Sequence, residues 1–370
     1  MRKPGMLTRG QFLQLLTGCT GLAMGTNGAM LYEWFKWPPL NTSIKRPPKL
    51  GTTFSQLQCS YLGIDYQKAF EHICSLGFNT IRLCAYWSEI ERAPNTFDFS
   101  TLDWLLGTAE KHSIDVVLTV GMKAPRWPEF HFPDWVKERC DTSNTGQPLD
   151  ANDALADHTL NFVQAVMQHT KDAQGITSWQ IENEAFNRPD VAAGRFLSYE
   201  FVQREVALAR ALARPGQRVV LTNGISLSPL DFSQDDERAF QQSLSLADAV
   251  GINVYSKIGT FLPGMYETPF PVYWRKLANW RDSLKSAGKA AWITEAQAEP
   301  WEYKSLVAIG RAGYPSASPQ SATDLAITLG QLEYNPVFLW GCEYWYWQKV
   351  NGRNNWWAGL QQFIQPYDGL

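Results

Sequence analysis

The sequence lacks the spacings by which short motifs hold metal ions. Its six cysteines include no C-x-x-C pair, and its five histidines show no metal-ligand spacing. Structural zinc sites are built from such closely spaced thiol and imidazole ligands. We therefore expect no zinc site, and no motif in the chain indicates another metal or a cofactor.

The chain also has little excess of either charge. Its formal net charge is −3 at pH 7, and it contains no long basic block. Nucleic-acid binding therefore has no electrostatic support. Hydrophobic residues make up 45% of the 370 residues, which is enough for a large core and argues against wholesale disorder.

The N-terminal segment lacks the long, uninterrupted apolar run of a spanning helix. It opens with Arg2, Lys3 and Arg9 and continues with a weakly apolar stretch that polar residues interrupt. This order is typical of an export signal. We expect residues 1–36 to be an export signal or an N-terminal membrane anchor, so that the protein is exported or held at the cell envelope. The alternative is a cytoplasmic protein with a loosely docked N-terminus. The proline-rich residues 37–49 then predict a linker.

From residue 50 onward, short apolar runs alternate with longer helix-like stretches. This pattern predicts strands joined by helices. The strands are expected at 50–55, 79–87, 114–121, 176–184, 218–224, 249–256, 290–296 and 337–347. Eight such units predict an α/β fold of the (β/α)8 TIM barrel type over residues 50–370. A doubly wound open sheet is the weaker alternative, because no glycine-rich phosphate loop follows the first strand.

Polar residues gather at the ends of the predicted strands. The active site of such a barrel lies at the carboxyl ends of its strands. The fourth strand ends in Glu182-Asn183-Glu184, and the seventh carries Glu295 near its end. The other strand ends of interest are those with Arg82 and Trp87 (second), Asn253 and Tyr255 (sixth), and Glu343, Trp345 and Trp347 (eighth).

Two carboxyl groups across a barrel mouth suit the hydrolysis of a glycosidic bond. One is held neutral to protonate the leaving oxygen, and the other stays ionised to attack or to direct water. Each Glu also has a structural interpretation: Glu182 as a partner of a neighbouring loop, Glu295 as half of an ion pair, and Glu343 as a satisfied acid. The pair is harder to explain in this way than either residue alone.

The strand ends carry a family resemblance. "WQIENEAF" (179–186), "WITEAQ" (292–297) and "YWYW" (344–347) resemble the acid/base strand, the nucleophile strand and the aromatic platform of clan A glycoside hydrolases. The fourth-strand motif is especially similar to β-galactosidase-like members. The sixth strand reads Asn253-Val254-Tyr255 and lacks the His-x-Tyr of common cellulase-like members, so the exact family stays open.

The resemblance implies a role for each matching residue. Glu184 would be the general acid/base, and Glu295 the nucleophile of a retaining double displacement. Asn183 would bind the sugar 2-hydroxyl, and Trp345 would stack on the sugar. Tyr255 and Arg82 would hold Glu295 in place and ionised.

Further residues complete the expected substrate site. Asn253 and Trp87 lie at strand ends, and Trp127 belongs to the aromatic loop 125–135 after the third strand. That loop predicts either a substrate wall or a cover packed over the barrel. An excess of tryptophan, 16 in all, also suits a sugar-binding cleft, because apolar sugar faces pack on aromatic rings.

The sequence therefore predicts a retaining hydrolase of β-linked oligo- or polysaccharides. The first alternative is a barrel of the same fold that binds carbohydrate without catalysis, which the presence of both carboxyl groups disfavours. The second is a metal-dependent hydrolase, which would require His-x-His pairs that the strands lack. The sugar, the linkage, exo or endo cleavage and the oligomeric state stay open.

Overall fold

The eight long strands close into one parallel barrel. The computed structural model describes residues 36–187, 192–227, 236–260, 262, 264–303, 305–309 and 315–365. Around the barrel the strand order is β1-β10-β9-β6-β5-β4-β3-β2, and every pair is parallel. The strands are β1 (Leu50–Thr53), β2 (Thr80–Cys84), β3 (Asp115–Val120), β4 (Ile176–Ile181), β5 (Arg218–Gly224), β6 (Ala249–Val254), β9 (Ala290–Gln297) and β10 (Val337–Trp340). The predicted TIM barrel is confirmed.

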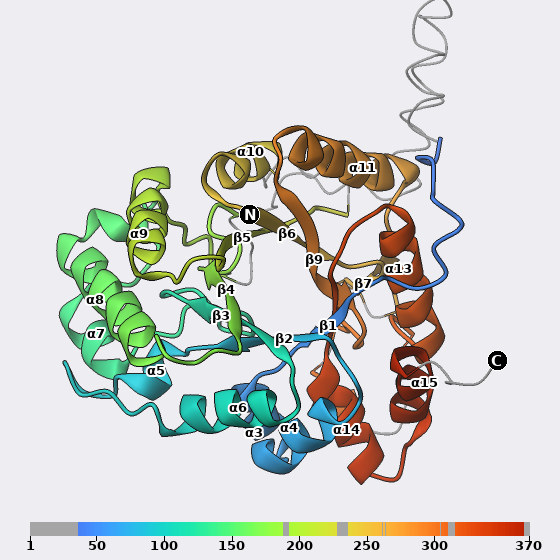
Figure 1. Ribbon diagram of the computed structural model, residues 1–370, viewed down its shortest axis with the longest axis horizontal. Coiled ribbons are helices and arrows are strands. Elements are labelled where there is room, and N and C mark those ends of the chain that lie inside the picture. The colour runs from blue at the N-terminus through green and yellow to red at the C-terminus, as the bar shows by residue number, and fades with distance from the viewer. Residues whose placement is uncertain are drawn as a thin grey trace, which may run out of the picture.

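Helices form the outer ring around this barrel (Figure 1). A two-stranded hairpin, β7 (Ile258–Gly259) with β8 (Tyr266–Glu267), stands apart from the barrel sheet. The helices are α3 (Gln56–Leu62), α4 (Tyr66–Cys74), α5 (Trp87–Ile90), α6 (Ser100–Lys111), α7 (Asp134–Arg139), η1 (Leu149–Ala151), α8 (Asp153–His169), α9 (Tyr199–Leu212), α10 (Asp236–Leu246), α11 (Pro271–Ser286), α12 (Leu306–Ile309), α13 (Pro319–Gln331), α14 (Cys342–Val350) and α15 (Asn355–Ile364).

Polar side chains mark where several of these helices begin. Asp65, Asn152 and Ser198 each accept a hydrogen bond from a backbone N–H of the first turn of α4, α8 and α9. Ser318 and Ser321 make a reciprocal capping box at the start of α13. These oxygens satisfy donors that have no partner within the helix.

The barrel interior is apolar at one level and polar at the next. A separate cluster of buried apolar side chains from β3, β5, β6, β9 and β10 fills the first level: Val117, Val220, Ala249, Trp292 and Phe338. Above it, towards the carboxyl ends of the strands, Arg82, Gln180 and Thr222 are buried polar residues. Buried polar groups need partners, so this layer organises the chemistry at the barrel mouth.

Six predicted strands end earlier than expected, three of them by three residues or more, and the eighth shows why. It was predicted over 337–347, but β10 stops at Trp340 and the chain becomes α14. Gly341 makes the turn with φ of 113°, and a Cβ there would lie 2.4 Å from Cβ of Glu299. Only glycine fits such a position without strain. The fourth strand likewise ends at Ile181, and the second ends at Cys84.

The segment predicted as a linker lies along the outside of the barrel. Trp37 stacks on Trp274 of α11 with ring centroids 5.3 Å apart, and the Asn41 N–H donates to the Gln331 carbonyl at 2.9 Å. Every helix in the described part of the chain is too short or too polar to span a bilayer. The expected export signal or anchor, residues 1–36, lies almost entirely outside the described residues.

Candidate active site

Glu184 and Glu295 lie at the carboxyl end of the barrel. Glu295 belongs to β9, and Glu184 lies three residues beyond the end of β4. Two strands, β5 and β6, separate them around the barrel. The negative charge of Glu295 helps to raise the pKa of Glu184, so the two carboxyl groups interact.

Glu295 is held by a positive charge and a hydroxyl. The Arg82 guanidinium donates to Oε1 at 2.7 Å, and the Tyr255 hydroxyl donates to Oε2 at 2.6 Å. Burial, and then the charge of Glu295, raise the pKa of Tyr255 well above its usual value, so the phenol stays a donor. Both oxygens of the Glu295 carboxyl group therefore accept a hydrogen bond.

Arg82 is itself fixed in a single direction. Its side chain is fully buried, its Nε donates to Thr53 Oγ1 at 2.8 Å, and its Nη1 donates to Gln180 Oε1 at 3.2 Å. Arg82 thereby links β1, β2, β4 and β9 beneath the barrel mouth. The position of the Glu295 carboxylate therefore follows from the barrel scaffold itself.

Glu184 stands in a different environment. Burial raises its pKa to about 7, helped by the negative charges of Glu129 and Glu295 and opposed by Lys123. The Asn253 side-chain amide donates to Oε1 of Glu184 at 2.8 Å. Thr294 fixes the direction of this amide, because its hydroxyl donates to Asn253 Oδ1 at 2.7 Å. Near neutral pH, Glu184 can therefore give up or take a proton, as a general acid/base requires.

The backbone around Glu184 is tied to β3 and β5. The Glu184 N–H donates to Thr222 Oγ1 at 2.8 Å, and its carbonyl accepts from Lys123 Nζ at 3.0 Å. Thr222 also donates to Asn183 Oδ1 at 3.3 Å. Asn183 is buried beside Glu184.

The Glu182 carboxyl group is bound by backbone N–H groups. Its carboxyl oxygens accept from the N–H groups of Met122 at 2.9 Å and Lys123 at 2.5 Å, and its side chain is fully buried. The carboxyl lies over Gly121, where a Cβ would stand 2.4 Å from it. Glu182 thus joins the ends of β3 and β4, in agreement with its structural interpretation.

Two tryptophans expected in the substrate site lie elsewhere. Trp345 is fully buried on α14 and its Nε1 donates to the Ala298 carbonyl, so the expected sugar platform at Trp345 is wrong. Trp87 begins α5, is fully buried and stacks on Phe162, so it cannot present a ring face to substrate. Trp127, by contrast, is 78% exposed. The predictions for Trp87 and Trp345 were wrong because the second and eighth strands were predicted to extend past their actual ends.

The carboxyl end of the barrel also holds a second charged cluster, which the sequence did not predict. Arg126 pairs with Glu299, and its Nη2 also lies 2.5 Å from Oε2 of Glu343. The guanidinium lies over the Trp340 ring, 4.0 Å from its centroid. Glu343 also accepts from the Ser55 N–H at 2.5 Å, which makes it a satisfied structural acid. Only the glycine after "VFLW" signals in the sequence that Trp340, rather than Trp345, ends the strand.

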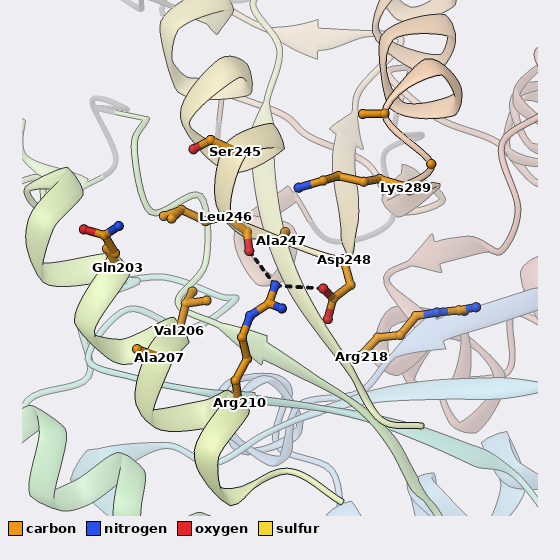
Figure 2. Close-up of a pocket in the computed structure, with 12 residues that line it drawn as sticks. Gln203, Val206, Ala207, Arg210, Arg218, Ser245, Leu246, Ala247, Asp248 and Lys289 are labelled. Atoms are coloured by element: carbon orange, nitrogen blue, oxygen red, sulfur yellow. Dashed lines mark hydrogen bonds and ion pairs between the residues drawn. The ribbon is translucent and has the colours of Figure 1, made fainter. Parts of the chain in front are cut away.

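The opposite end of the barrel holds a cavity of about 640 Å³ (Figure 2). It is lined at the amino ends of β5, β6 and β9 by residues that include Arg218, Asp248 and Lys289. Figure 2 shows the Arg210 guanidinium directed at both Asp248 and the Leu246 carbonyl, at 2.7 Å from each. None of the expected site residues lines this cavity.

Comparison with known proteins finds a family model that matches part of the chain. Residues 64–195 match the model of a glycoside hydrolase family described as β-galactosidase. No curated protein matches the chain in sequence.

Solved structures share the fold at low identity. A GH5_18 protein from Streptomyces cattleya in complex with GlcNAc aligns over 88% of this chain and 82% of its own, with a TM-score of 0.57 and 14% identity. A GH5_18 variant from Bifidobacterium longum in complex with Manβ1-4GlcNAc aligns over 80% of this chain and 68% of its own, with a TM-score of 0.56 and 12% identity. The exo-β-1,4-mannosidase Op5Man5 from Opitutaceae bacterium strain TAV5 aligns over 85% of this chain and 59% of its own, with a TM-score of 0.53 and 14% identity. The family match and the closed eight-stranded barrel together fit a glycoside hydrolase of clan A.

Proposed function

We propose that this glycoside hydrolase cleaves β-linked carbohydrate with retention, using Glu295 as nucleophile and Glu184 as general acid/base. The observation that carries the proposal is the contrast between the two carboxyl groups. Arg82 and Tyr255 hold Glu295 as an acceptor, whereas burial raises the pKa of Glu184 to about 7. A retaining glycosidase needs this division between one ionised and one protonated group.

The reaction follows in two steps. In the first, a Glu295 oxygen attacks the anomeric carbon while Glu184 gives its proton to the leaving oxygen, and the glycosidic C–O bond breaks. In the second, the Glu184 carboxylate takes a proton from water, the water oxygen attacks the anomeric carbon, and the ester bond to Glu295 breaks. Two inversions at one carbon give net retention.

The neighbours of the pair have supporting roles. Asn253 donates to Glu184 and directs its carboxyl group, and Arg82 opposes the negative charge of Glu295. Asn183 offers an amide beside Glu184 for a sugar hydroxyl. Trp340 takes the place of Trp345 as the aromatic residue that ends the eighth barrel strand.

The test is a panel of aryl β-glycosides and β-linked oligosaccharides, with the first product followed by NMR. The panel includes β-galactosides because of the family match, and β-mannosides because the aligned structures include an exo-β-1,4-mannosidase. We expect at least one substrate to give a product that first appears in the β configuration. A product that first appears in the α configuration contradicts the proposed mechanism. The absence of hydrolysis across the panel, together with measurable binding, supports a barrel that binds without catalysis.

We also propose that the protein works outside the cytoplasm or at the cell envelope. This proposal rests on the basic start and weakly apolar stretch of residues 1–36. Fractionation of cells that express the full chain, compared with a chain lacking residues 1–36, tests it. The full chain is expected in the exported or envelope fraction and the shortened chain in the cytoplasm. Equal distribution of both contradicts the proposal.

A further inference from the structure

Exposed tryptophans mark the rim of the candidate site. Three tryptophans are exposed in the described residues, and Trp37 among them stacks on the outside of the barrel. The other two, Trp127 at 78% and Trp301 at 38%, follow β3 and β9 at the carboxyl end. Large exposed aromatic rings beside an active site indicate a binding surface, because leaving them in water is unfavourable.

Trp301 stands next to the proposed nucleophile. Its ring meets the Tyr255 ring edge to face, with centroids 4.9 Å apart and an interplanar angle of 86°. Tyr255 in turn donates to Glu295 at 2.6 Å. A single side chain therefore separates the exposed ring of Trp301 from the reacting carboxylate.

The loop that carries Trp301 is held on two sides. The Trp301 carbonyl accepts from the Gly259 N–H at 2.8 Å, and its N–H donates to Ser316 Oγ at 2.9 Å. The next residue, Glu302, accepts from the Ser316 N–H at 2.9 Å and the Tyr266 hydroxyl at 2.8 Å. A ring on so constrained a backbone loses little freedom when a ligand packs on it.

Trp127 lies in a tight turn that is held in the same way. The Glu129 N–H donates to the Arg126 carbonyl at 2.8 Å, and the Ala124 N–H donates to the Glu129 carbonyl at 2.8 Å. Arg126 has φ of 84°, a conformation that side-chain-bearing residues adopt at a cost of about 1 kcal/mol or more. Other contacts must therefore stabilise this turn.

One buried ion pair joins the two loops. Arg126 directly precedes Trp127, and Glu299 lies two residues before Trp301; the two side chains pair at the barrel mouth. Glu343 and the Trp340 ring fix the same guanidinium from two further sides. Loss of one partner would leave a buried charge unpaired, so the pair constrains the two loops relative to each other.

We propose that Trp127 and Trp301 are two sugar-stacking platforms, held relative to each other by the Arg126–Glu299 pair, and that they bind a β-linked oligosaccharide longer than one sugar unit. The inference rests on the proposed glycosidase function and deepens it by naming an extended substrate. Apolar sugar faces pack on aromatic rings, and two fixed rings select a chain that reaches both. The Arg126–Glu299 pair is a positioning element and takes no part in the bond-breaking steps.

The platforms are tested with Trp127→Ala and Trp301→Ala, and with Trp37→Ala as a matched control on the outer surface. For β-linked oligosaccharides we expect KM to rise roughly tenfold in each rim variant, as the loss of one stacking contact implies. For aryl β-monoglycosides we expect kcat/KM to change less than about threefold in the Trp127 variant. Equal effects on both substrate classes, or no effect on either, would overturn the proposal.

A binding measurement separates this proposal from the proposed catalysis. Oligosaccharide binding to Glu295→Gln is followed by calorimetry, with and without Trp127→Ala. Weaker binding in the double variant supports the platforms even if the native chain hydrolyses no member of the panel. Unchanged binding contradicts the platforms even if hydrolysis is found.

The ion pair is tested by exchanging Arg126. Arg126→Met is expected to raise KM for oligosaccharides by more than it lowers kcat for aryl glycosides, whereas Arg126→Lys keeps a positive charge and restores part of the affinity. An equal loss of oligosaccharide affinity in Arg126→Met and Arg126→Lys, or an effect confined to kcat, contradicts a positioning role.

Discussion

The two ends of the barrel contain the same kinds of charged residue in different settings. At the amino end, Arg210 and Asp248 pair on a half-exposed surface beside a cavity of about 640 Å³. At the carboxyl end, Arg82 and Glu295 pair with almost no exposure, and burial raises the pKa of the nearby Glu184. The cavity is large, yet the Arg210–Asp248 pair beside it is half-exposed. Burial and the arrangement of partners, more than the size of a cavity, therefore indicate the site of chemistry.

The largest effect is expected from the two carboxyl groups. Glu295→Gln removes the attacking oxygen and is expected to lower kcat/KM by more than about 10³-fold. Glu184→Gln is expected to lower it by about 10²–10⁴-fold for substrates whose leaving group needs a proton. Arg218→Gln at the amino end is the control and should leave activity unchanged. Steady-state kinetics measure the three variants. A comparable loss of kcat/KM in Arg218→Gln would contradict the assignment of the catalytic site to the carboxyl end.

Two arginine substitutions compare the ends in stability. Arg82→Met leaves the buried Glu295 without its cation, and we expect the free energy of unfolding to fall by about 3–5 kcal/mol. Arg210→Met breaks a half-exposed pair and should lower it by about 1 kcal/mol or less, because Asp248 still accepts from the Val219 N–H. Denaturant unfolding measures both. Equal losses would show that burial does not distinguish the two pairs.

The pH profile tests the environment of Glu184. Since burial raises its pKa to about 7, the fraction of protonated acid, and with it kcat/KM, should fall as the pH rises through about 7. Glu129→Gln removes a nearby negative charge, so the alkaline limb should move to lower pH by roughly half a unit. Glu110→Gln on the exposed face of α6 is the matched control. A shift to higher pH in Glu129→Gln contradicts the assignment.

Stability should depend on pH through the same residue. The folded chain binds a proton at Glu184 up to about pH 7, whereas the unfolded chain loses it near pH 4.5. The contribution of Glu184 to the free energy of unfolding is therefore constant below about pH 4.5, decreases between 4.5 and 7, and stays low above. Glu184→Gln should be more stable than the native chain at pH 8 by on the order of 1 kcal/mol. A free energy of unfolding at pH 8 that is lower for Glu184→Gln than for the native chain contradicts this expectation.

The sequence predicts strands better than it predicts side-chain positions. All eight barrel strands were expected, because short runs rich in β-branched residues have a pattern unlike that of the helices. The contacts of Glu295 with Tyr255 and Arg82 are those expected, whereas the hydrogen bond from Asn253 to Glu184 was not expected. These residues lie on or next to strands, whose carboxyl ends the barrel brings together.

Loops and strand ends were harder to predict. Trp345 was expected at the site because "VFLWGCEYWYW" was predicted as a single strand and "YWYW" resembles the aromatic platform of clan A glycoside hydrolases. The hydrophobic pattern alone does not show that Gly341 turns the chain into a helix. The Arg126–Glu299 pair joins residues 173 positions apart on two loops. No local pattern specifies such a contact, since it depends on how the closed barrel brings the loops together.

Trapping the covalent intermediate tests the central claim most directly. The enzyme is incubated with an activated 2-deoxy-2-fluoro β-glycoside of a sugar it hydrolyses, then digested and examined by mass spectrometry. We predict a single glycosyl label on the peptide that contains Glu295, and no label in Glu295→Gln. A label on Glu182, Glu184 or Glu343 would contradict the account.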